Sequence, residues 1–592
     1  MPGPRGEAEK SKDFGKAIKR LFKELKNFKV LAIMSILLAT ISSVVSIAVP
    51  NILSNLTDEI TKGLSMPMDF GAIWKLVIII AALQIGSAIA GVLEGFLMTD
   101  VSNRFAQELR DRISHKINRL PLKFFDRNQT GDTLSRVTND VDTIAQSLNE
   151  SLSTIVAAVA LFIGVVVMMF VTNWIMATTA VISGTIGFIF VFFVLKKSQK
   201  YFTARQKELG NINSHIEEVY SGLNVVKAYN GRAEVDREFD RLNKKVYDAN
   251  RKSQFLSGLM PPMMNFIGNL GYVAVCVVGA LLVMNDATTF GTIVAFIIYV
   301  RMFTSPLTQI AQSLNYLQSC AAASERVFEF LDEEEMPEQK PAQHLDKDKV
   351  RGMIEFRHVK FGYDEDKLII KDFSVLAKPG QKIAIVGPTG AGKTTMVNLL
   401  MRFYDVNSGS ILIDGVPISE LSRENVRSLF TMVLQDTWLF AGTVKENIVY
   451  NRKDVSDKEV WSICDKVGLT HFIKTLPKGL DSDISENDSV SAGQRQLITI
   501  ARGMVEHAPF LILDEATSNV DTRTEELVQK AMDKLMHGKT SFIIAHRLST
   551  IKNADLIMVM RDGNIVETGK HKDLLKKNGF YAELYNSQFQ IT

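Results

Sequence analysis

Five long apolar stretches occupy the first half of the chain, and four of them contain no charged residue. They are Val30–Leu53, Leu76–Leu93, Ser151–Leu195, Ser253–Asn285 and Ala287–Ser324, the last interrupted only by Arg301. A helix needs about 20 apolar residues to cross a bilayer, where its backbone amides must be satisfied within the segment. The third stretch is long enough for two crossings, with Asn173-Trp174 as the turn between them. The sequence therefore predicts six transmembrane helices within residues 30–324.

Basic residues near the ends of these stretches predict their orientation. Nine Lys and Arg residues lie in Met1–Lys29, whereas the three connections expected on the opposite side hold two, Lys62 and Lys75. Because Lys and Arg are in excess on the cytoplasmic side, both termini are expected in the cytoplasm. Residues 1–29 lack the apolar core of a signal peptide. Within them, Phe14–Phe28 predicts an interfacial amphipathic helix, with an ordinary solvated helix as the alternative.

Two long charged loops separate the predicted spans on the cytoplasmic side, Asp100–Glu150 and Lys196–Lys252. Gly and Pro are sparse in both, unlike in irregular loops. Each loop is therefore expected to form two helices that leave the membrane and return. The tip of each hairpin could dock against a cytoplasmic domain.

The composition changes after Ser324. An acidic, Pro-containing segment, residues 325–350, suits a linker, and residues 351–592 alternate β-branched runs with helical patterns. The predicted fold class is thus multidomain, with an α-helical membrane domain followed by an α/β domain of the P-loop type. A net charge of +3 gives no indication of nucleic-acid binding, and the three cysteines are expected to be free thiols.

The α/β region contains a glycine-rich phosphate-binding motif between an apolar strand, Lys382–Val386, and a helix that begins near Met396. The motif and the residue after it are Gly387, Pro388, Thr389, Gly390, Ala391, Gly392, Lys393, Thr394 and Thr395. Glycines let backbone amides turn toward phosphate oxygens, while Lys393 neutralises phosphate charge and the Thr394 hydroxyl can ligate Mg²⁺. This P-loop predicts ATP and Mg²⁺ as cofactors.

Two further motifs follow the P-loop. Phe510–Leu513 is an apolar strand that ends in Asp514 and Glu515, and buried carboxylates at such a position need a cation or a reactive water. Asp514 would hold Mg²⁺ through water, and Glu515 would polarise the attacking water. The Ser-Ala-Gly-Gln turn that opens a helix would present a hydroxyl and amides to an anion. Its residues are Ser491, Ala492, Gly493 and Gln494. Taken alone, the acidic pair or this turn could be a helix cap.

With these three motifs in order, the chain resembles an ABC transporter along essentially its whole length. The resemblance implies that Tyr363 stacks on adenine and that Gln435 contacts Mg²⁺ and faces the transmembrane domain. It also implies that His546 contacts the γ-phosphate and that Asp521, in the D-loop, crosses to a second subunit. Two nucleotide-binding domains of this family sandwich two ATP molecules, so the single domain here implies a half transporter that pairs with a second ABC chain.

The two long loops resemble the coupling loops of the exporter branch, which implies export in the cell membrane of a bacterium. The segments that carry this resemblance are Leu120–Asp126, Gly131-Asp132, Ser135–Val141, Glu217-Glu218, Gly222 and Val226–Tyr229. The signature turn departs from the family pattern, because Val490 and Ala492 replace its first and third residues and Ser485–Ser489 contains no glycine. A chain of this kind resembles the catalytically intact subunit of heterodimeric bacterial multidrug exporters. A homodimer with a variant signature is the alternative.

Hydrophobic small molecules of drug-like, amphipathic character are the expected substrates, with lipids or peptides as alternatives. Arg301 would lie about 20 Å along a helix that starts near Thr288, too deep to reach the interface easily. It is expected to face the interior of the helix bundle, paired with Glu94 of the second span, or to line the transport cavity. An arginine closer to the cytoplasmic interface is the alternative.

Overall fold

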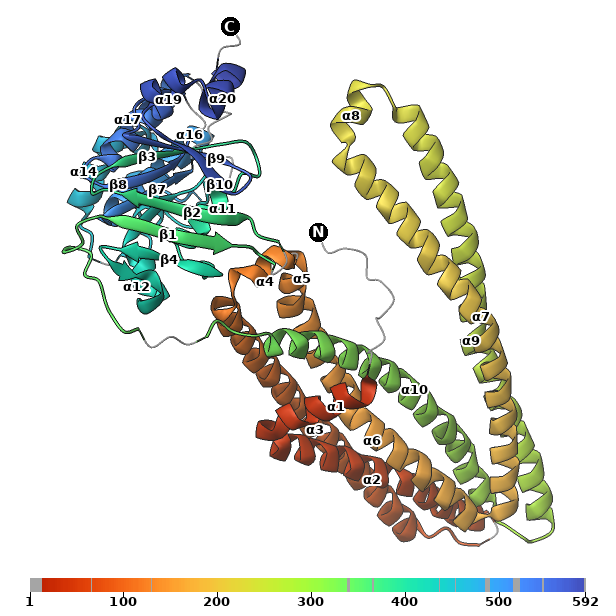
Figure 1. The fold of residues 1–592 in the computed structure, drawn as a ribbon. Helices are drawn as coiled ribbons and strands as arrows, with labels where there is room; N and C mark the ends of the chain where they lie inside the picture. Colours follow the sequence, from red (N-terminus) through yellow and green to blue (C-terminus); the bar gives the residue numbers. More distant parts are fainter. Residues whose placement is uncertain are drawn as a thin grey trace. The chain divides into compact units, whose positions relative to one another are not determined.

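A computed structural model describes residues 13–64, 66–128, 130–337, 341–364, 367–435, 437–452, 454–484, 490–514, 522–545 and 548–589 (Figure 1). The chain forms two compact units. Met1–Arg119 and Asn128–Glu334 make up the first unit, and Leu120–Arg127 and Glu335–Thr592 make up the second. The short segment Leu120–Arg127 therefore belongs with the second unit, although it falls inside the predicted membrane domain.

The first unit is helical throughout its described elements. They are α1 (Phe14–Glu24), the 3₁₀ turn η1 (Leu25–Phe28), α2 (Lys29–Lys62), α3 (Phe70–Arg119), α5 (Thr130–Ser135), the π-helical turn η2 (Arg136–Asp140), α6 (Val141–Thr172), α7 (Trp174–Ser221), α8 (Leu223–Ala228), α9 (Arg232–Met284) and α10 (Phe290–Asp332). Among the described residues, six helical segments are long and apolar enough to cross a membrane, as predicted. The expected turn at Asn173 is present, because its side chain caps α7 by accepting hydrogen bonds from the amides of Ile175 and Met176.

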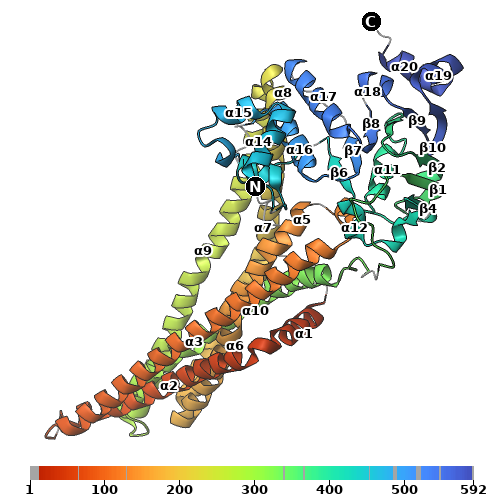
Figure 2. The same cartoon turned by 90° about the vertical axis from the view of Figure 1, so that its left-hand side faces the viewer.

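The helices of this unit pack in antiparallel pairs: α2 with α3, α6 with α10 and α7 with α9. Figures 1 and 2 show α7 and α9 side by side, with α8 at the tip between them. These two helices have 48 and 53 residues, which at 1.5 Å per residue is about 70–80 Å and far more than the bilayer requires. The predicted helical hairpin is therefore present in the second loop. The first loop is also helical, but α4 (Leu122–Arg127), α5 and η2 interrupt it between α3 and α6.

Helix α10 is longer than the sequence analysis predicts, since it continues through Glu325 to Asp332. The acidic composition indicates a linker there, but Val327, Phe328 and Phe330 are buried, and this burial stabilises the last turns of the helix. Its last turn also contacts α1. The Arg20 guanidinium pairs with the Asp332 carboxylate, and it lies 4.5 Å above the ring of Phe328.

The start of α10 approaches α2 closely at Gly291. The amide of Gly291 donates a 2.8 Å hydrogen bond to Oδ1 of Asp58, a carboxylate at a helix N-terminus. A Cβ at position 291 would lie 2.1 Å from the backbone oxygen of Ser54. Only glycine fits this crossing without moving one helix.

We expect Gly291→Ala to lower the thermal stability of the full-length protein in detergent, since overpacking costs about 1–3 kcal/mol. Gly86 on α3 is the matched control, because a Cβ built there meets nothing within 4 Å. Gly86→Ala should leave the melting temperature unchanged or slightly higher. Equal melting temperatures for the two variants would show that the α2–α10 crossing can relax.

The second unit is an α/β domain. Its strands are β1 (Ile354–Phe361), β2 (Ile370–Ala377), β3 (Lys382–Val386), β4 (Ser408–Ile413), β5 (Val416–Pro417), β6 (Phe430–Val433), β7 (Phe510–Asp514), β8 (Thr540–Ile544), β9 (Leu556–Arg561) and β10 (Asn564–Gly569). Its helices are α4 (Leu122–Arg127), α11 (Lys393–Leu400), η3 (Ile418–Glu420), α12 (Arg423–Ser428), α13 (Val444–Val449), α14 (Asp457–Val467), α15 (Thr470–Thr475), η4 (Gly479–Asp481), α16 (Ala492–Val505), α17 (Thr522–Met536), α18 (Leu548–Lys552), α19 (His571–Lys577) and α20 (Phe580–Phe589). The described strands form one sheet in the order β5-β4-β1-β2-β10-β9-β3-β8-β7-β6.

Both faces of the central strands are buried. In β3, Ile383 and Ile385 point into one apolar core, while Ala384 and Val386 point into the other. Helices α14, α16 and α17 gather on one side of the sheet (Figure 2). Parallel strands covered on both faces read as continuous apolar runs. This explains the runs seen before the glycine-rich motif and before Asp514, and it confirms the predicted fold class.

Candidate functional site

Four neighbouring parallel strands, β3, β8, β7 and β6, end at one edge of the sheet. Register places Ile544 of β8 between Ile385 of β3 and Asp514 of β7. The P-loop leaves β3 at this edge, and Gln435 follows β6 there as an exposed residue. In open α/β sheets, ligands bind beyond the carboxyl ends of the strands. This edge is therefore the candidate site.

The P-loop turns from β3 into α11 through backbone conformations that favour glycine. Gly390 and Gly392 have φ values of +82° and +99°. A Cβ at Gly387 would lie 2.3 Å from the backbone oxygen of Met560. Gly392 is also the N-cap residue of α11, and no side chain caps the first amides of that helix. Amides at a helix N-terminus suit a phosphate group.

Lys393 folds back over this loop. Its ammonium group donates hydrogen bonds to the backbone oxygens of Gly387, at 2.7 Å, and Pro388, at 3.0 Å. Burial lowers the pKa of Lys393, and the negative charge of Asp514 partly opposes that shift. The cation and the carboxylate thus act on each other across the strand edge. The loop, Lys393, the exposed Thr394 hydroxyl and Asp514 together fit a nucleotide phosphate chain accompanied by a divalent cation.

Tyr363 packs against the first turns of α11. Its hydroxyl donates to Oγ1 of Thr395 at 3.3 Å and accepts from Nδ2 of Asn398 at 3.2 Å. The ring makes edge contacts with Phe361 and with Tyr404, whose centroids lie 5.0 and 4.9 Å away. The expected adenine-stacking residue is therefore anchored beside the phosphate loop.

Tyr404 connects this aromatic cluster to α4. Its hydroxyl donates a hydrogen bond to Asp126, and Arg127 of α4 forms an ion pair with Asp364. Burial and the hydrogen bond to the Asp126 carboxylate both raise the pKa of Tyr404. The sequence analysis identified Leu120–Asp126 as a coupling segment but missed Tyr404, for which the only local signal is an aromatic pair just after the P-loop helix.

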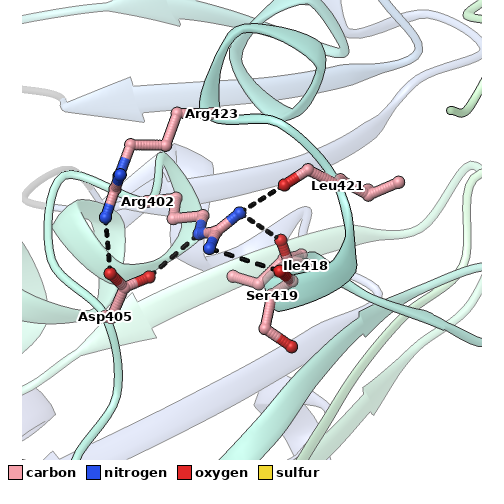
Figure 3. A network of polar contacts seen from close by, with 6 residues as sticks. All are labelled: Arg402, Asp405, Ile418, Ser419, Leu421 and Arg423. Atoms are coloured by element: carbon pink, nitrogen blue, oxygen red, sulfur yellow. Dashed lines mark hydrogen bonds and ion pairs between the residues drawn. The ribbon is translucent and has the colours of Figure 1, made fainter. Parts of the chain in front are cut away.

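A buried arginine organises the chain that follows α11 (Figure 3). The guanidinium of Arg402 is 2% exposed and donates to Asp405 and to the backbone oxygens of Ile418, Ser419 and Leu421. Arg423 pairs with the other carboxylate oxygen of Asp405. Arg402 thus satisfies backbone carbonyl groups in and after η3 and holds in place the segment that follows α11. Lys393 lies at the other end of α11.

Arg402→Met should destabilise the full-length protein by about 2–4 kcal/mol, because several backbone acceptors lose a charged donor. Arg423→Met removes one hydrogen bond to Asp405 and should cost about 1 kcal/mol. Chemical unfolding, followed by the fluorescence of the tryptophans, measures both. A larger loss for Arg423→Met would contradict the central role of Arg402.

The signature segment begins helix α16. Ser491 is its N-cap, with Oγ accepting from the amide of Gln494 at 3.3 Å, while the Gln494 side chain accepts from the amide of Ser491 at 3.0 Å. This reciprocal capping box satisfies two amides of the first turn. Ser491 is exposed, Ala492 and Gln494 are partly exposed and Gly493 is buried. The helix-cap interpretation therefore holds in this single chain, and action at a second subunit stays a proposal.

Several predicted site residues lie outside the described part of the chain. They are Glu515 and His546, the D-loop residue Asp521, and the segment Ser485–Ser489. Their roles stay predictions. The strands that lead to the first two, β7 and β8, end at the candidate site.

The predicted membrane residues do not pair. Glu94 accepts a hydrogen bond from Ser35 at 3.4 Å, and Ser35 also meets Ser153 at 3.1 Å. Arg301 is exposed on α10, and within the described residues its guanidinium contacts no carboxylate. The expected ion pair with Glu94 therefore does not form within this chain. The physical reason is that Arg301 lies on the face of α10 opposite the buried side chains that pack on other helices. The expectation that Arg301 lines the transport cavity stays a prediction.

The fold and this site define a membrane-spanning helical domain fused to an ATP-binding α/β domain. Residues 32–307 match the family model of the ABC transporter transmembrane region, and residues 370–518 match the ABC transporter family model. The chain belongs to the ABC transporter family, as a half transporter with its permease and ATPase in one polypeptide. It is a multi-pass membrane protein whose ATP hydrolysis is coupled to transport.

Several curated relatives match along most of their length. A fatty acid ABC transporter ATP-binding/permease protein of Mycobacterium bovis is 40% identical, over 97% of both chains. The uncharacterized ABC transporter ATP-binding protein YfiC of Bacillus subtilis is 37% identical, over 98% of this chain and 96% of its own. An ATP-dependent lipid A-core flippase of Syntrophus aciditrophicus is 35% identical, over 84% of this chain and 82% of its own.

Tyr404→Phe should reduce the amount of substrate moved per ATP hydrolysed by several-fold while ATP binding persists. The variant removes only the hydroxyl that holds Asp126 and keeps the ring against Tyr363. ATPase activity and transport are measured on the same proteoliposomes. Tyr585→Phe is a control far along the chain from this contact, and unchanged coupling in both variants would contradict a role for Tyr404.

Proposed function

We propose that this chain is one subunit of a dimeric exporter that uses ATP to move amphipathic compounds out of the cytoplasm by alternating access. The observation that carries the proposal is the strand-edge P-loop in a chain that also holds six apolar helices. Both termini would lie in the cytoplasm and the protein in the bacterial cell membrane, as the distribution of Lys and Arg indicates.

The substrate is proposed to be an apolar or amphipathic small molecule, drug-like in the broad sense. Export of a lipid is the second candidate, because two relatives are named for a fatty acid and for lipid A. A direct test uses proteoliposomes, in which the transporter inserts in both orientations. ATP added outside the vesicles reaches only those molecules whose nucleotide-binding domain faces the external solution. ATP-dependent loss of an amphipathic dye supports a pump, whereas flux that dissipates a gradient without hydrolysis supports a channel and contradicts the proposal.

The nucleotide site would bind ATP with Mg²⁺. Amides of Gly387–Thr395 and the Lys393 ammonium would hold the phosphates, while Thr394, Gln435 and Asp514 offer oxygen atoms for the cation. Mg²⁺ would neutralise the charge on the phosphates. Tyr363 would contact the adenine. The residues proposed for hydrolysis are Glu515, which orients the attacking water, and His546, which contacts the γ-phosphate.

A second ABC chain would complete each site, since this chain has one nucleotide-binding domain. Ser491–Gln494 would act on the ATP held by the partner, and Asp521 would reach across the interface. Ala492 adds a methyl group to the signature, where the family has a residue without a side chain. We propose a heterodimer in which the site on this chain's P-loop hydrolyses ATP and the site under this chain's signature mainly holds it.

Glu515→Gln in the assembled complex should leave ATP binding intact and reduce hydrolysis by about 100-fold or more, because a positioned general base contributes that much to catalysis. The matched change at the equivalent residue of the partner should reduce turnover little. ATPase assays on complexes purified through a tag on this chain measure both. Equal losses, or full activity from this chain alone, would replace the heterodimer with a homodimer that has a variant signature.

A further inference from the structure

The exposed faces of the membrane helices are of two kinds. On α2, the exposed residues Ile33, Leu37, Ile41 and Val44 follow one another at helical spacing and are all apolar. Such a face suits contact with lipid chains. On α10, by contrast, a polar stripe is exposed. It consists of Arg301, Ser305, Thr308, Gln312 and Asn315.

The spacing of the polar stripe, four, three, four and three residues, keeps its members on one side of the helix. The opposite side holds Phe296, Tyr299 and Phe303, which are buried against α6 and neighbouring helices. The stripe begins 11 residues after Phe290, about 17 Å along the helix and near the middle of a hydrocarbon core of about 30 Å. Arg301, Ser305 and Thr308 fall within that core, whereas Gln312 and Asn315, about 33 and 38 Å along the helix, fall beyond it. Polar groups within the core face a water-filled cavity or another protein surface rather than lipid.

The polar stripe carries a positive charge that this chain does not neutralise. Among the described residues, Arg301 forms no ion pair. The acidic group within the predicted spans, Glu94, accepts from Ser35 instead. A second copy of this chain would bring the same arginine and the same engaged carboxylate. The counterion would then come from a bound molecule, with a carboxylate of a different partner chain as the alternative that the test below separates.

We propose that the polar stripe binds the anionic head group of an amphiphile, which makes Arg301 a specificity-determining residue. This inference rests on the proposed export function and names its substrate class. The guanidinium would pair with a carboxylate or phosphate oxygen, and the hydroxyl group of Ser305, about one turn further along the helix, would donate a hydrogen bond to the same head group.

The test uses three probes with the same alkyl chain: dodecanoate, dodecanol and dodecyltrimethylammonium. Complexes purified through a tag on this chain are reconstituted in proteoliposomes, and stimulation of ATPase activity and transport are measured for each probe. In the wild type, dodecanoate should act at a lower concentration than dodecanol, and the cationic probe should be least effective. Transport of the cationic probe alone would leave the export function standing and overturn this inference.

Arg301→Gln should raise the half-maximal concentration of dodecanoate about tenfold while leaving that of dodecanol unchanged. Arg301→Lys should retain most of the preference, because the charge remains. Arg241→Gln is the matched control, since Arg241 is an exposed arginine on the cytoplasmic part of α9 and pairs with Glu238. It should change neither response.

Three outcomes would overturn the proposal. Equal loss of both responses in Arg301→Gln would indicate a structural role, and loss of the partner chain during purification would indicate a subunit interface. No response to any probe would remove the export proposal as well. Should Arg301→Gln fail to accumulate, Ser305→Ala tests the same site, and an unchanged dodecanoate preference in that variant contradicts the inference.

Discussion

Hydrogen bonding of the backbone in a bilayer is the constraint on which the first unit depends. Water is absent from the hydrocarbon core, so each span must satisfy its own amides and carbonyls as a helix. The same regular bonding continues beyond the membrane, where α7 and α9 extend without interruption to α8. Continuous helices are stiff, so movement at the α8 end of this hairpin reaches the apolar segments of α7 and α9.

The nucleotide site depends on a different regularity, the shared edge of parallel strands. Four strands that are far apart in the sequence place the P-loop, Gln435 and Asp514 at the same edge of the sheet. Burial of both faces of the sheet holds that edge still, and Arg402 holds the far end of α11. The ammonium group of Lys393 donates hydrogen bonds to backbone oxygens of its own loop. A phosphate can compete for it there, because a charged phosphate oxygen is a stronger acceptor than a backbone carbonyl group.

Local patterns predicted much of this architecture. Charge-free runs identified the spans, Asn173 identified a turn, and the glycines identified the phosphate loop. The sequence does not predict the end of α10, because the acidic composition after Ser324 indicates a linker. The burial of Val327 and Phe328 depends on packing against other helices, which the local sequence does not show. Contacts between distant segments left no local signal. Tyr404 and Asp126 are 278 residues apart, and the local sequence around either residue does not predict their contact. The side of α10 on which Arg301 lies also depended on packing rather than on composition.

The assignment of Leu120–Arg127 to the second unit means that this unit is discontinuous in sequence. A single proteolytic cut between α10 and β1 would break the chain without separating the two parts, since α4 would still contact Tyr404 and Asp364. A fragment that starts after α10 would conversely lack an element of its own fold and expose the surface that α4 covers. The boundaries of the second unit in space therefore differ from its boundaries in the sequence.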